Sequence, residues 1–368
     1  MRISQLLIGA SPGDAVTEAA LRLSDALSLI AESEVYAVHI HPALEGRVTR
    51  LAKFPLDGSA DDVLILHVSI GEPGIADFVA NCPERVILSY HNITPSSFFE
   101  EFDPAFAARL RAGRWELKAF ADSAMGAIAD SEFNAAELKA LGLTDIEVAP
   151  PPLNLQRLHD IEPDAHFTDE LAAVEGPLLL TVGQILPHKR PELAVDAHHL
   201  LNVNYLPKAR LFIAGVFTNP LYSSALVRHV ESLKLSTVRV LGAVTDAQLS
   251  ALYRRADVLL VPSEHEGFCV PIIEAFSLGV PVVARGFGAI PETAGAAALV
   301  LPCSATAADL CEAVNRVLSD KAISLEMTRL GLERARLFTA EETLHGSLAA
   351  LARVLQREPV LAISDHLT

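Results

Sequence analysis

The sequence predicts an α/β protein made of two domains, each built on its own parallel sheet. Three observations support this prediction: a length of 368 residues, a hydrophobic share of 51%, and a steady alternation of short apolar β-type runs with helical stretches. That alternation is typical of parallel sheets whose strands are joined by crossover helices. A chain of this length also exceeds one ordinary domain, so two hydrophobic cores are expected.

The β-type runs fall into two groups, one in each half of the chain. In the first half they are residues 3–8, 35–40, 63–68, 86–89, 127–129 and 146–148. In the second half they are residues 178–182, 210–214, 238–241, 258–261, 280–284 and 298–301. Each group is large enough for a doubly wound, Rossmann-like sheet.

A proline-rich segment separates the two halves. Three consecutive prolines end at Pro152 and are followed by a polar, acidic stretch over residues 156–175. Prolines stiffen the exit from the first half, and the acidic stretch is typical of a surface connection. We therefore expect a hinge here, with an N-terminal domain at residues 1–170 and a C-terminal domain at residues 171–339.

Charge and hydropathy exclude several classes of protein. The formal net charge of −17 argues against a nucleic-acid partner, because phosphate backbones are bound by an excess of Lys and Arg. No apolar run approaches the ~18 residues of a membrane span, and the N-terminus lacks the order of a signal peptide. A cytoplasmic protein is expected, with the inner face of a membrane as an open alternative. The four cysteines show no close pairing and are expected to be reduced thiols.

Two glutamates with seven residues between them mark the most informative segment. The apolar run 258–261 is followed by Glu266, and Glu274 comes after Pro271, which suits the start of a helix. Both carboxylates therefore fall near the C-terminal end of a strand, where open α/β sheets bind ligands. The backbone N–H groups of the helix start suit a phosphate or sugar oxygen. These groups belong to Gly267, Phe268, Cys269 and Val270.

This segment resembles the donor-binding segment of the retaining glycosyltransferases of family 4. That family carries a Glu-x7-Glu motif within a framework of serine, Glu-Gly-Phe, proline, Glu-Ala and Gly-x-Pro-Val-Val. The matching elements here are Ser263, Glu266–Phe268, Pro271, Glu274–Ala275 and Gly279–Val283. The resemblance implies a GT-B fold, in which two Rossmann-like domains face each other across a cleft. It also implies that the amphipathic C-terminal helix, at about 340–368, crosses back onto the first domain.

A second match follows the β-type run 178–182. Gly183 and Gln184 come first, and Lys189 and Arg190 follow. A lysine at such a strand-to-helix junction can place a point charge on a phosphate. The family has an arginine after the glycine and a lysine about five residues on, both reaching the donor diphosphate. Lys189 fits the second role, whereas Gln184 replaces the arginine with a neutral amide.

The first domain contains a third match, in the loop after the run 86–89. His91 opens the sequence His-Asn-Ile-Thr-Pro and resembles the histidine that family 4 enzymes direct at the transferred sugar. The same pentapeptide is similar to a subset of bacterial polysaccharide-building members. Ser131 lies in a further family-like segment, where its stronger interpretation is a helix N-cap.

Two loops complete the predicted donor site. Gly13 and Asp14 join the first strand to a helix, and in the family this loop closes over the donor phosphate. Asp14 is equally consistent with a helix cap. The loop after the run 238–241 contains Val244, where the family lets the nucleobase rest against the backbone.

The resemblance therefore implies a retaining glycosyltransferase that moves a sugar from a nucleotide sugar to an acceptor hydroxyl in glycan or polysaccharide biosynthesis. GDP-mannose is the first expected donor and a UDP-sugar the next. His91, Glu266 and Lys189 are the expected catalytic residues, Glu274 would hold the ribose, and no metal or other cofactor is expected. A glycan, a lipid-linked molecule or a small molecule could be the acceptor, and peripheral membrane association stays open. A nucleotide-sugar epimerase and a non-catalytic nucleotide-sugar-binding protein are the alternatives.

Overall fold

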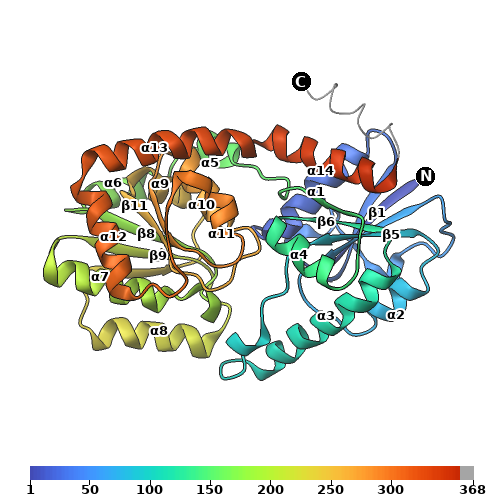
Figure 1. Cartoon of the computed structure of the whole chain (residues 1–368), viewed down its shortest axis with the longest axis horizontal. Coiled ribbons are helices and arrows are strands. Elements are labelled where there is room, and N and C mark those ends of the chain that lie inside the picture. Colours follow the sequence, from blue (N-terminus) through green and yellow to red (C-terminus); the bar gives the residue numbers. More distant parts are fainter. Residues whose placement is uncertain (357–368) are drawn as a thin grey trace. The chain divides into compact units, whose positions relative to one another are not determined.

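A computed structural model of the chain describes residues 1–356 (Figure 1). The chain forms two compact units. The first consists of Met1–Glu100, Pro104–Asn154 and the residues from Phe338 onward, and the second of Glu101–Asp103 and Leu155–Leu337. The division after Asn154 lies earlier than the expected boundary at residue 170.

The earlier division has a physical reason in two short helices. α5 (Gln156–Asp160) and α6 (Ala165–Ala172) both pack against α9 (Asp246–Arg255) of the second unit. The hydroxyl of Ser250 on α9 also donates a 2.7 Å hydrogen bond to the carbonyl of Leu158. The acidic stretch expected to be a surface connection is thus largely helical and belongs to the second unit.

The first unit is built on a seven-stranded sheet with the order β3-β2-β1-β4-β5-β6-β7, in which every strand pairing is parallel. Its strands are β1 (Arg2–Ala10), β2 (Glu32–Ile40), β3 (Thr49–Arg50), β4 (Val63–Val68), β5 (Arg85–Tyr90), β6 (Gly126–Ala129) and β7 (Ile146–Val148). Its helices are α1 (Ala15–Leu27), α2 (Ile75–Ala80), α3 (Pro104–Ser123), α4 (Glu132–Ala140) and α14 (Ala340–Leu355), with short 3-10 turns at Pro42–Leu44, Leu51–Lys53 and Ser96–Phe98.

One face of this sheet is covered by α1 and α14. Leu23 and Leu27 of α1 pack with Leu348 and Leu351 of α14 against Ile65 and its neighbours in the sheet. The apolar spacing of the predicted C-terminal helix is what buries it here. The part of that predicted helix beyond Gln356 lies outside the described residues.

The second unit is built on a six-stranded parallel sheet with the order β10-β9-β8-β11-β12-β13. Its strands are β8 (Leu178–Val182), β9 (Arg210–Ala214), β10 (Val238–Gly242), β11 (Val258–Val261), β12 (Val282–Arg285) and β13 (Leu299–Leu301). Its further helices are α7 (Pro191–Asn204), α8 (Pro220–Ser232), α10 (Val270–Ser277), α11 (Ile290–Ala294), α12 (Ala307–Ser319) and α13 (Lys321–Ala335), with 3-10 turns η4 (Pro187–Lys189), η5 (Gly295–Ala297) and, running into the first unit, η6 (Arg336–Phe338).

The predicted fold class is confirmed, because each predicted β-type run forms a strand of the expected sheet. The strand that the sequence did not reveal is β3, which has two residues and pairs with β2 at the edge of the first sheet. Such a short run carries no readable apolar period.

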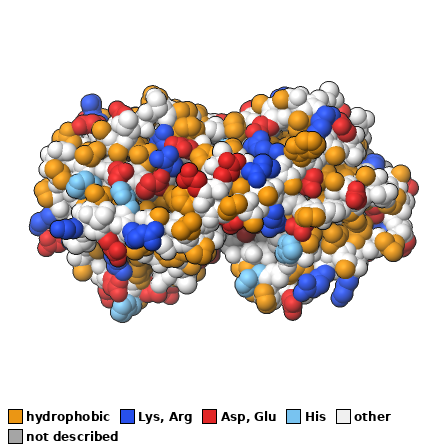
Figure 2. Space-filling view, turned by 90° about the horizontal axis from the view of Figure 1, so that it is seen from below, with side chains coloured by type: hydrophobic (Ala, Val, Ile, Leu, Met, Phe, Trp, Pro, Cys, Tyr) orange, Lys and Arg blue, Asp and Glu red, His pale blue; other side chains and the backbone are white. Residues whose placement is uncertain are grey.

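The described residues contain no helix long and apolar enough to cross a membrane. The four cysteines are free thiols, of which Cys269 and Cys311 are buried, Cys82 is half-buried and Cys303 is exposed. On the face shown in Figure 2, acidic and basic side chains are interspersed.

Candidate functional site

Two of the predicted site residues form a partly buried ion pair in the second unit. Lys189 ends η4 after strand β8, and Glu266 lies in the loop after the neighbouring strand β11. The Nζ atom of Lys189 lies 2.8 Å and 2.7 Å from Oε1 and Oε2 of Glu266. Burial opposes the charge of Lys189, but Glu266 outweighs it and raises the pKa of the lysine above its ordinary value. A fixed positive charge is therefore held at the carboxyl edge of the sheet.

The loop that carries Glu266 is held by a close backbone approach. Gly288 has a φ of +58°, and a Cβ atom there would lie 2.3 Å from the carbonyl oxygen of Glu266. The same carbonyl accepts a 2.9 Å hydrogen bond from the N–H of Ala289. Glycine is required at position 288 because any side chain would displace this loop.

The second glutamate of the motif, Glu274, is held by two donors. It lies on α10 with 5% of its surface exposed. Its Oε2 accepts a 2.9 Å hydrogen bond from the hydroxyl of Tyr253, and its Oε1 lies 2.5 Å from Nη2 of Arg157. Burial raises the pKa of the Glu274 carboxyl, and the contacts with Arg157 and Tyr253 oppose that rise. The carboxylate is thus fixed in one orientation before any ligand binds.

The turn between the two glutamates runs from Gly267 to Val270, and Cys269 is its least ordinary residue. Cys269 caps α10 in the left-handed conformation, with a φ of +74°, and its side chain is buried. Burial, followed by the charge of Glu266, raises the pKa of its thiol well above the ordinary value. Thr293 donates a 2.5 Å hydrogen bond to the carbonyl of Phe268 and fixes the turn from the side of α11.

A small cavity lies at the carboxyl ends of β8 and β11. Gly183, Gln184 and Lys189 line it from one side and Ser263 from the other. Gln184, which stands where the family has an arginine, is exposed. The structure therefore brings three of the predicted diphosphate-binding residues to one cavity.

Arg190 is directed elsewhere, into a cluster of carboxylates. Its Nη1 lies 2.6 Å from Oε1 of Glu264 and its Nε 2.5 Å from Oε1 of Glu192. Glu264 also accepts a 3.0 Å hydrogen bond from Arg285. Although burial works against the charge of Glu264, Arg285 and Arg190 hold the pKa of that carboxyl below its ordinary value. Arg190 is thus paired with carboxylates and does not line the cavity that Gln184 and Lys189 line.

The loop expected near the nucleobase follows strand β10. Val244 lies in it, just before Thr245, whose side chain caps α9. The ring of Phe217, from the loop after β9, lies against Gly242, where a Cβ atom would come within 2.9 Å of it. Phe217 is 45% exposed, so an aromatic surface adjoins this loop.

In the first unit, His91 is held at both ring nitrogens. His91 follows β5 directly, and its Nδ1 lies 2.8 Å from Oδ2 of Asp130, which follows β6. Its Nε2 lies 2.8 Å from Nδ1 of His67 on β4. His67 in turn contacts Oε1 of Gln5 on β1 through its Nε2, at 2.9 Å. Four neighbouring strands of the sheet contribute to this chain of polar groups.

The loop that follows His91 is tied to helix α4. Asn92 has a φ of +74°, and its amide donates to Asn134 at 2.9 Å and to Glu137 at 3.0 Å. Ser131 caps α4, as predicted, by accepting a 3.2 Å hydrogen bond from the N–H of Asn134. The position of His91 is therefore set from both β6 and α4.

Gly13 and Asp14 lie at the start of α1. Gly13 has a φ of +74° and open space where a Cβ atom would be. Asp14 caps the helix, with its Oδ2 accepting hydrogen bonds from the N–H and the hydroxyl of Thr17 at 2.9 Å and 2.8 Å. Of the two roles expected for Asp14, the structure shows the helix cap.

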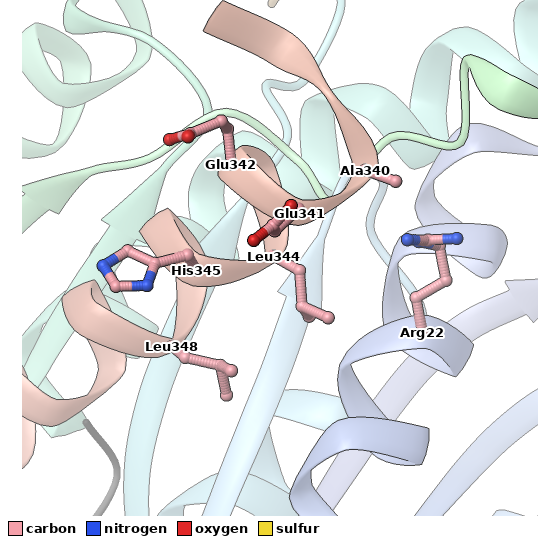
Figure 3. A pocket seen from close by; sticks show the side chains of 7 residues that line it. All are labelled: Arg22, Ala340, Glu341, Glu342, Leu344, His345 and Leu348. Atoms are coloured by element: carbon pink, nitrogen blue, oxygen red, sulfur yellow. The ribbon is translucent and has the colours of Figure 1, made fainter. Parts of the chain in front are cut away.

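A larger open cavity of about 310 Å³ lies away from the predicted donor residues, within the first unit. Figure 3 shows Arg22 of α1 directed toward the first turns of α14, which contribute Glu341, Glu342 and His345. Two carboxylates oppose a diphosphate, and the cavity lies between helices rather than at strand ends. Its size alone therefore does not make it the donor site.

The second unit is a parallel α/β unit with fixed charges at the carboxyl edge of its sheet. This arrangement indicates a class of protein that binds an anionic, hydroxyl-rich ligand. Residues 164–333 match the family described as glycosyl transferases group 1. This match lies within the second unit, and the two parallel sheets of the chain are those of the GT-B fold that the sequence predicted.

Curated relatives agree with this assignment. The serotype-specific mannosyltransferase WbdA of Escherichia coli is 27% identical over 181 residues, which are 48% of this chain and 22% of that protein. The D-inositol 3-phosphate glycosyltransferase of Mycolicibacterium smegmatis is 28% identical over 241 residues, which are 64% of this chain and 54% of that protein. The chain thus spans about a fifth and about half the length of these two relatives.

A solved structure matches nearly the whole chain. Anabaena HepE in complex with UDP and glucose has a TM-score of 0.74 at 17% sequence identity, and the match covers 96% of this chain and 99% of that one. At this identity the likeness concerns the fold.

Sequence reasoning missed the residues that hold the predicted ones. Arg157 and Tyr253 fix Glu274, and His67 contacts His91, but none of the three lies in a recognisable motif. His67 did leave a signal, because it is the polar residue in the otherwise apolar run 63–68. A polar side chain buried in a strand needs a partner, which is a reason to look for one.

Proposed function

We propose that this protein is a retaining glycosyltransferase that transfers a sugar from a nucleotide sugar to an acceptor hydroxyl, in the building of a glycan or polysaccharide. The observation that carries the proposal is the ion pair of Lys189 and Glu266, with Glu274 on the helix that follows. These are the charged residues of the family's donor segment.

Lys189 would stabilise the diphosphate leaving group. Breaking the bond between sugar and phosphate builds negative charge on the phosphate oxygens, and a preformed positive charge stabilises that transition state more than the ground state. Its ammonium group is partly buried and already oriented by Glu266, so little reorganisation is needed when the donor binds. Gly183 and Gln184 line the same cavity and would contact the phosphates through the backbone and an amide.

Glu274 would bind the ribose hydroxyls of the donor. Each carboxylate oxygen has two lone pairs, so an oxygen that accepts from Tyr253 or Arg157 can accept a second hydrogen bond. Both donors favour the ionised form of Glu274, which is the better acceptor. Glu266 would hold hydroxyls of the transferred sugar, and His91 is the group that we assign to that sugar from the first unit.

GDP-mannose is the donor we expect first. This rests on the His-Asn-Ile-Thr-Pro sequence that begins at His91 and on the E. coli relative WbdA, which is named as a mannosyltransferase. A UDP-sugar is the second expectation, because HepE was solved with UDP and glucose.

Thermal unfolding in the presence of GDP-, UDP-, ADP- and dTDP-sugars tests the proposal, since a bound donor stabilises the folded state by mass action. A stabilising donor is then incubated with candidate acceptors and the products are analysed. A new glycoside with retained anomeric configuration is expected. An isomerised sugar without a glycoside would identify an epimerase, and stabilisation without turnover would identify a binding protein.

A variant of Glu274 tests whether the donor binds at the predicted site. Glu274→Ala removes ribose hydrogen bonds worth roughly 1–3 kcal/mol, so the donor nucleotide should bind more weakly. Titration calorimetry measures the change. Glu326→Ala is the matched control, since its side chain is 56% exposed on α13. Unchanged affinity in a folded Glu274→Ala protein would remove this residue from the site.

A further inference from the structure

The chain of polar groups behind His91 lies on an otherwise apolar face of the first sheet. Side chains two positions apart on a strand point to the same face of a sheet. Ile3, Ile65 and Ile87 pack against α1 and α14, so the side chains two positions further on, Gln5, His67 and Ser89, face the same helices. Gln5 is 0% exposed and His67 is 3% exposed. Groups this deeply buried are stable only if each donor faces an acceptor.

Gln5 determines which nitrogen of His67 carries a proton. Its Nε2 lies 2.9 Å from the carbonyl oxygen of Ala20, which can only accept. The amide oxygen of Gln5 therefore faces His67, and this oxygen can also only accept. Nε2 of His67 must donate to it across the 2.9 Å contact.

The protonation of His67 in turn determines which nitrogen of His91 carries a proton. Burial and the neighbouring His91 lower the pKa of His67 well below its ordinary value, so its ring is neutral. With the single proton on Nε2, its Nδ1 can only accept. The two rings are parallel within 3° and their centroids are 5.1 Å apart, while Nδ1 and Nε2 are 2.8 Å apart. The rings therefore meet edge to edge, in the geometry of a hydrogen bond rather than a stack.

The carboxylate of Asp130 can only accept, so Nδ1 of His91 donates to it while Nε2 of His91 donates to His67. Asp130 accepts at 2.8 Å from Nδ1 of His91, and both side chains are buried, at 9% and 4% exposed. A positive charge on His67 would face the neutral amide of Gln5 with no carboxylate beside it, which is costly in a buried site. On His91 the same charge is paired with the carboxylate of Asp130.

We propose that His67, oriented by Gln5, is a positioning residue that keeps a proton on Nε2 of His91, so that with Nδ1 donating to Asp130 neither ring nitrogen can take up a proton and His91 never acts as a general base. This inference rests on the role of His91 in the proposed function. It also means that the proton of the acceptor hydroxyl is taken up by a group other than His91.

The proton positions are tested without any donor by NMR of the full chain labelled with 15N-histidine, with His91 assigned by comparison with His91→Gln. At neutral pH we expect both ring nitrogens of His91 in the protonated range and one of its ring protons coupled across to Nδ1 of His67. An unprotonated nitrogen in His91 would overturn the inference.

Two variants of His67 test the positioning role. His67→Leu fills the strand position with an apolar side chain and removes the 2.8 Å acceptor, leaving the hydroxyl of Ser89 at 3.2 Å, so the Nε2 proton of His91 should exchange faster with water. We expect turnover to fall between about tenfold and 100-fold, with a smaller change in KM. His67→Asn offers an amide oxygen near the place of Nδ1, and it should restore both the protected proton and most of the turnover.

The outcomes separate this inference from the proposed function. His166→Leu is the control for turnover, because the side chain of His166 is 88% exposed in the second unit. Unchanged turnover in a folded His67→Leu protein would overturn the positioning role. A wild-type chain without transferase activity on any nucleotide sugar would overturn the proposed function, and NMR decides the proton positions in either case.

Discussion

The two units use one strand arrangement to present two different kinds of edge. Their sheets share the order of a doubly wound fold, with β1 beside β4 in the first unit and β8 beside β11 in the second. In each unit this is where the strand order reverses and a crevice forms. The second unit places the ion pair of Lys189 and Glu266 there, whereas in the first unit the uncharged pair of Gln5 and His67 lies within β1 and β4 themselves, buried under α1.

The difference shows how one scaffold separates two tasks. A diphosphate needs a fixed positive group, and in the second unit Glu266 raises the pKa of Lys189 and so keeps the lysine charged. In the first unit, by contrast, the contacts of His91 with His67 and Asp130 hold the imidazole ring at both of its nitrogens.

The largest effect is expected from removing the charge at the edge of the second unit. Lys189→Met should lower turnover by about 100-fold to 1,000-fold, because charge on the leaving phosphate loses its stabilising partner in the transition state. Donor affinity should change much less. Steady-state kinetics and calorimetry measure the two effects, and Lys208→Met is the matched control, since Lys208 is 74% exposed. Equal losses in rate and affinity would make Lys189 a passive anchor.

A backbone change should disturb the same edge without touching a charge. Gly288→Ala forces a Cβ atom to within 2.3 Å of the carbonyl oxygen of Glu266 at a φ of +58°. We expect a loss of about 1–3 kcal/mol in the free energy of unfolding, measured in urea, together with lower turnover. Gly346→Ala on α14 is the control, because nothing lies within 4 Å of a Cβ atom there. Full stability in Gly288→Ala would show that the loop carrying Glu266 yields easily.

The buried carboxyl of Glu274 should make the stability of the protein depend on pH. Its folded pKa lies above the ordinary value of 4.5, so on raising the pH the unfolded chain releases this proton first. The contribution of Glu274 to stability therefore falls as the pH rises from 4.5 through the folded pKa.

Glu274→Gln removes this dependence. Relative to the wild type, the variant should be more stable at pH 7 than at pH 4.5, as measured by urea unfolding at both values. The opposite sign would mean that Arg157 and Tyr253 outweigh burial.

The smallest effect is expected at the edge of the first unit. Asp14→Ala removes the N-cap of α1 and should lower the free energy of unfolding by about 1 kcal/mol. If Asp14 is only a cap, the affinity for the donor nucleotide stays unchanged, which sharpens the contrast with the charged edge of the second unit. Ser131→Ala, at the cap of α4, is the matched control. A loss of affinity specific to Asp14→Ala would show that the first unit also binds the phosphates.

The sequence by itself determined the two sheets and the residues of the family's motifs. The runs 63–68 and 258–261 predict strands because each is a short, largely apolar stretch, which can be read from the local sequence alone. Glu266, Glu274 and Lys189 were found for the same reason, since each lies in a short segment with its own pattern.

Only the tertiary structure decided which groups hold these residues. Arg157 and Glu274 are 117 positions apart in the sequence, and Gln5 and His67 are 62 apart. Strand pairing and helix packing bring them together, and no local period records such contacts. The division of the units before α5 has the same origin, because the acidic stretch is helical only where α9 provides an apolar surface to pack against.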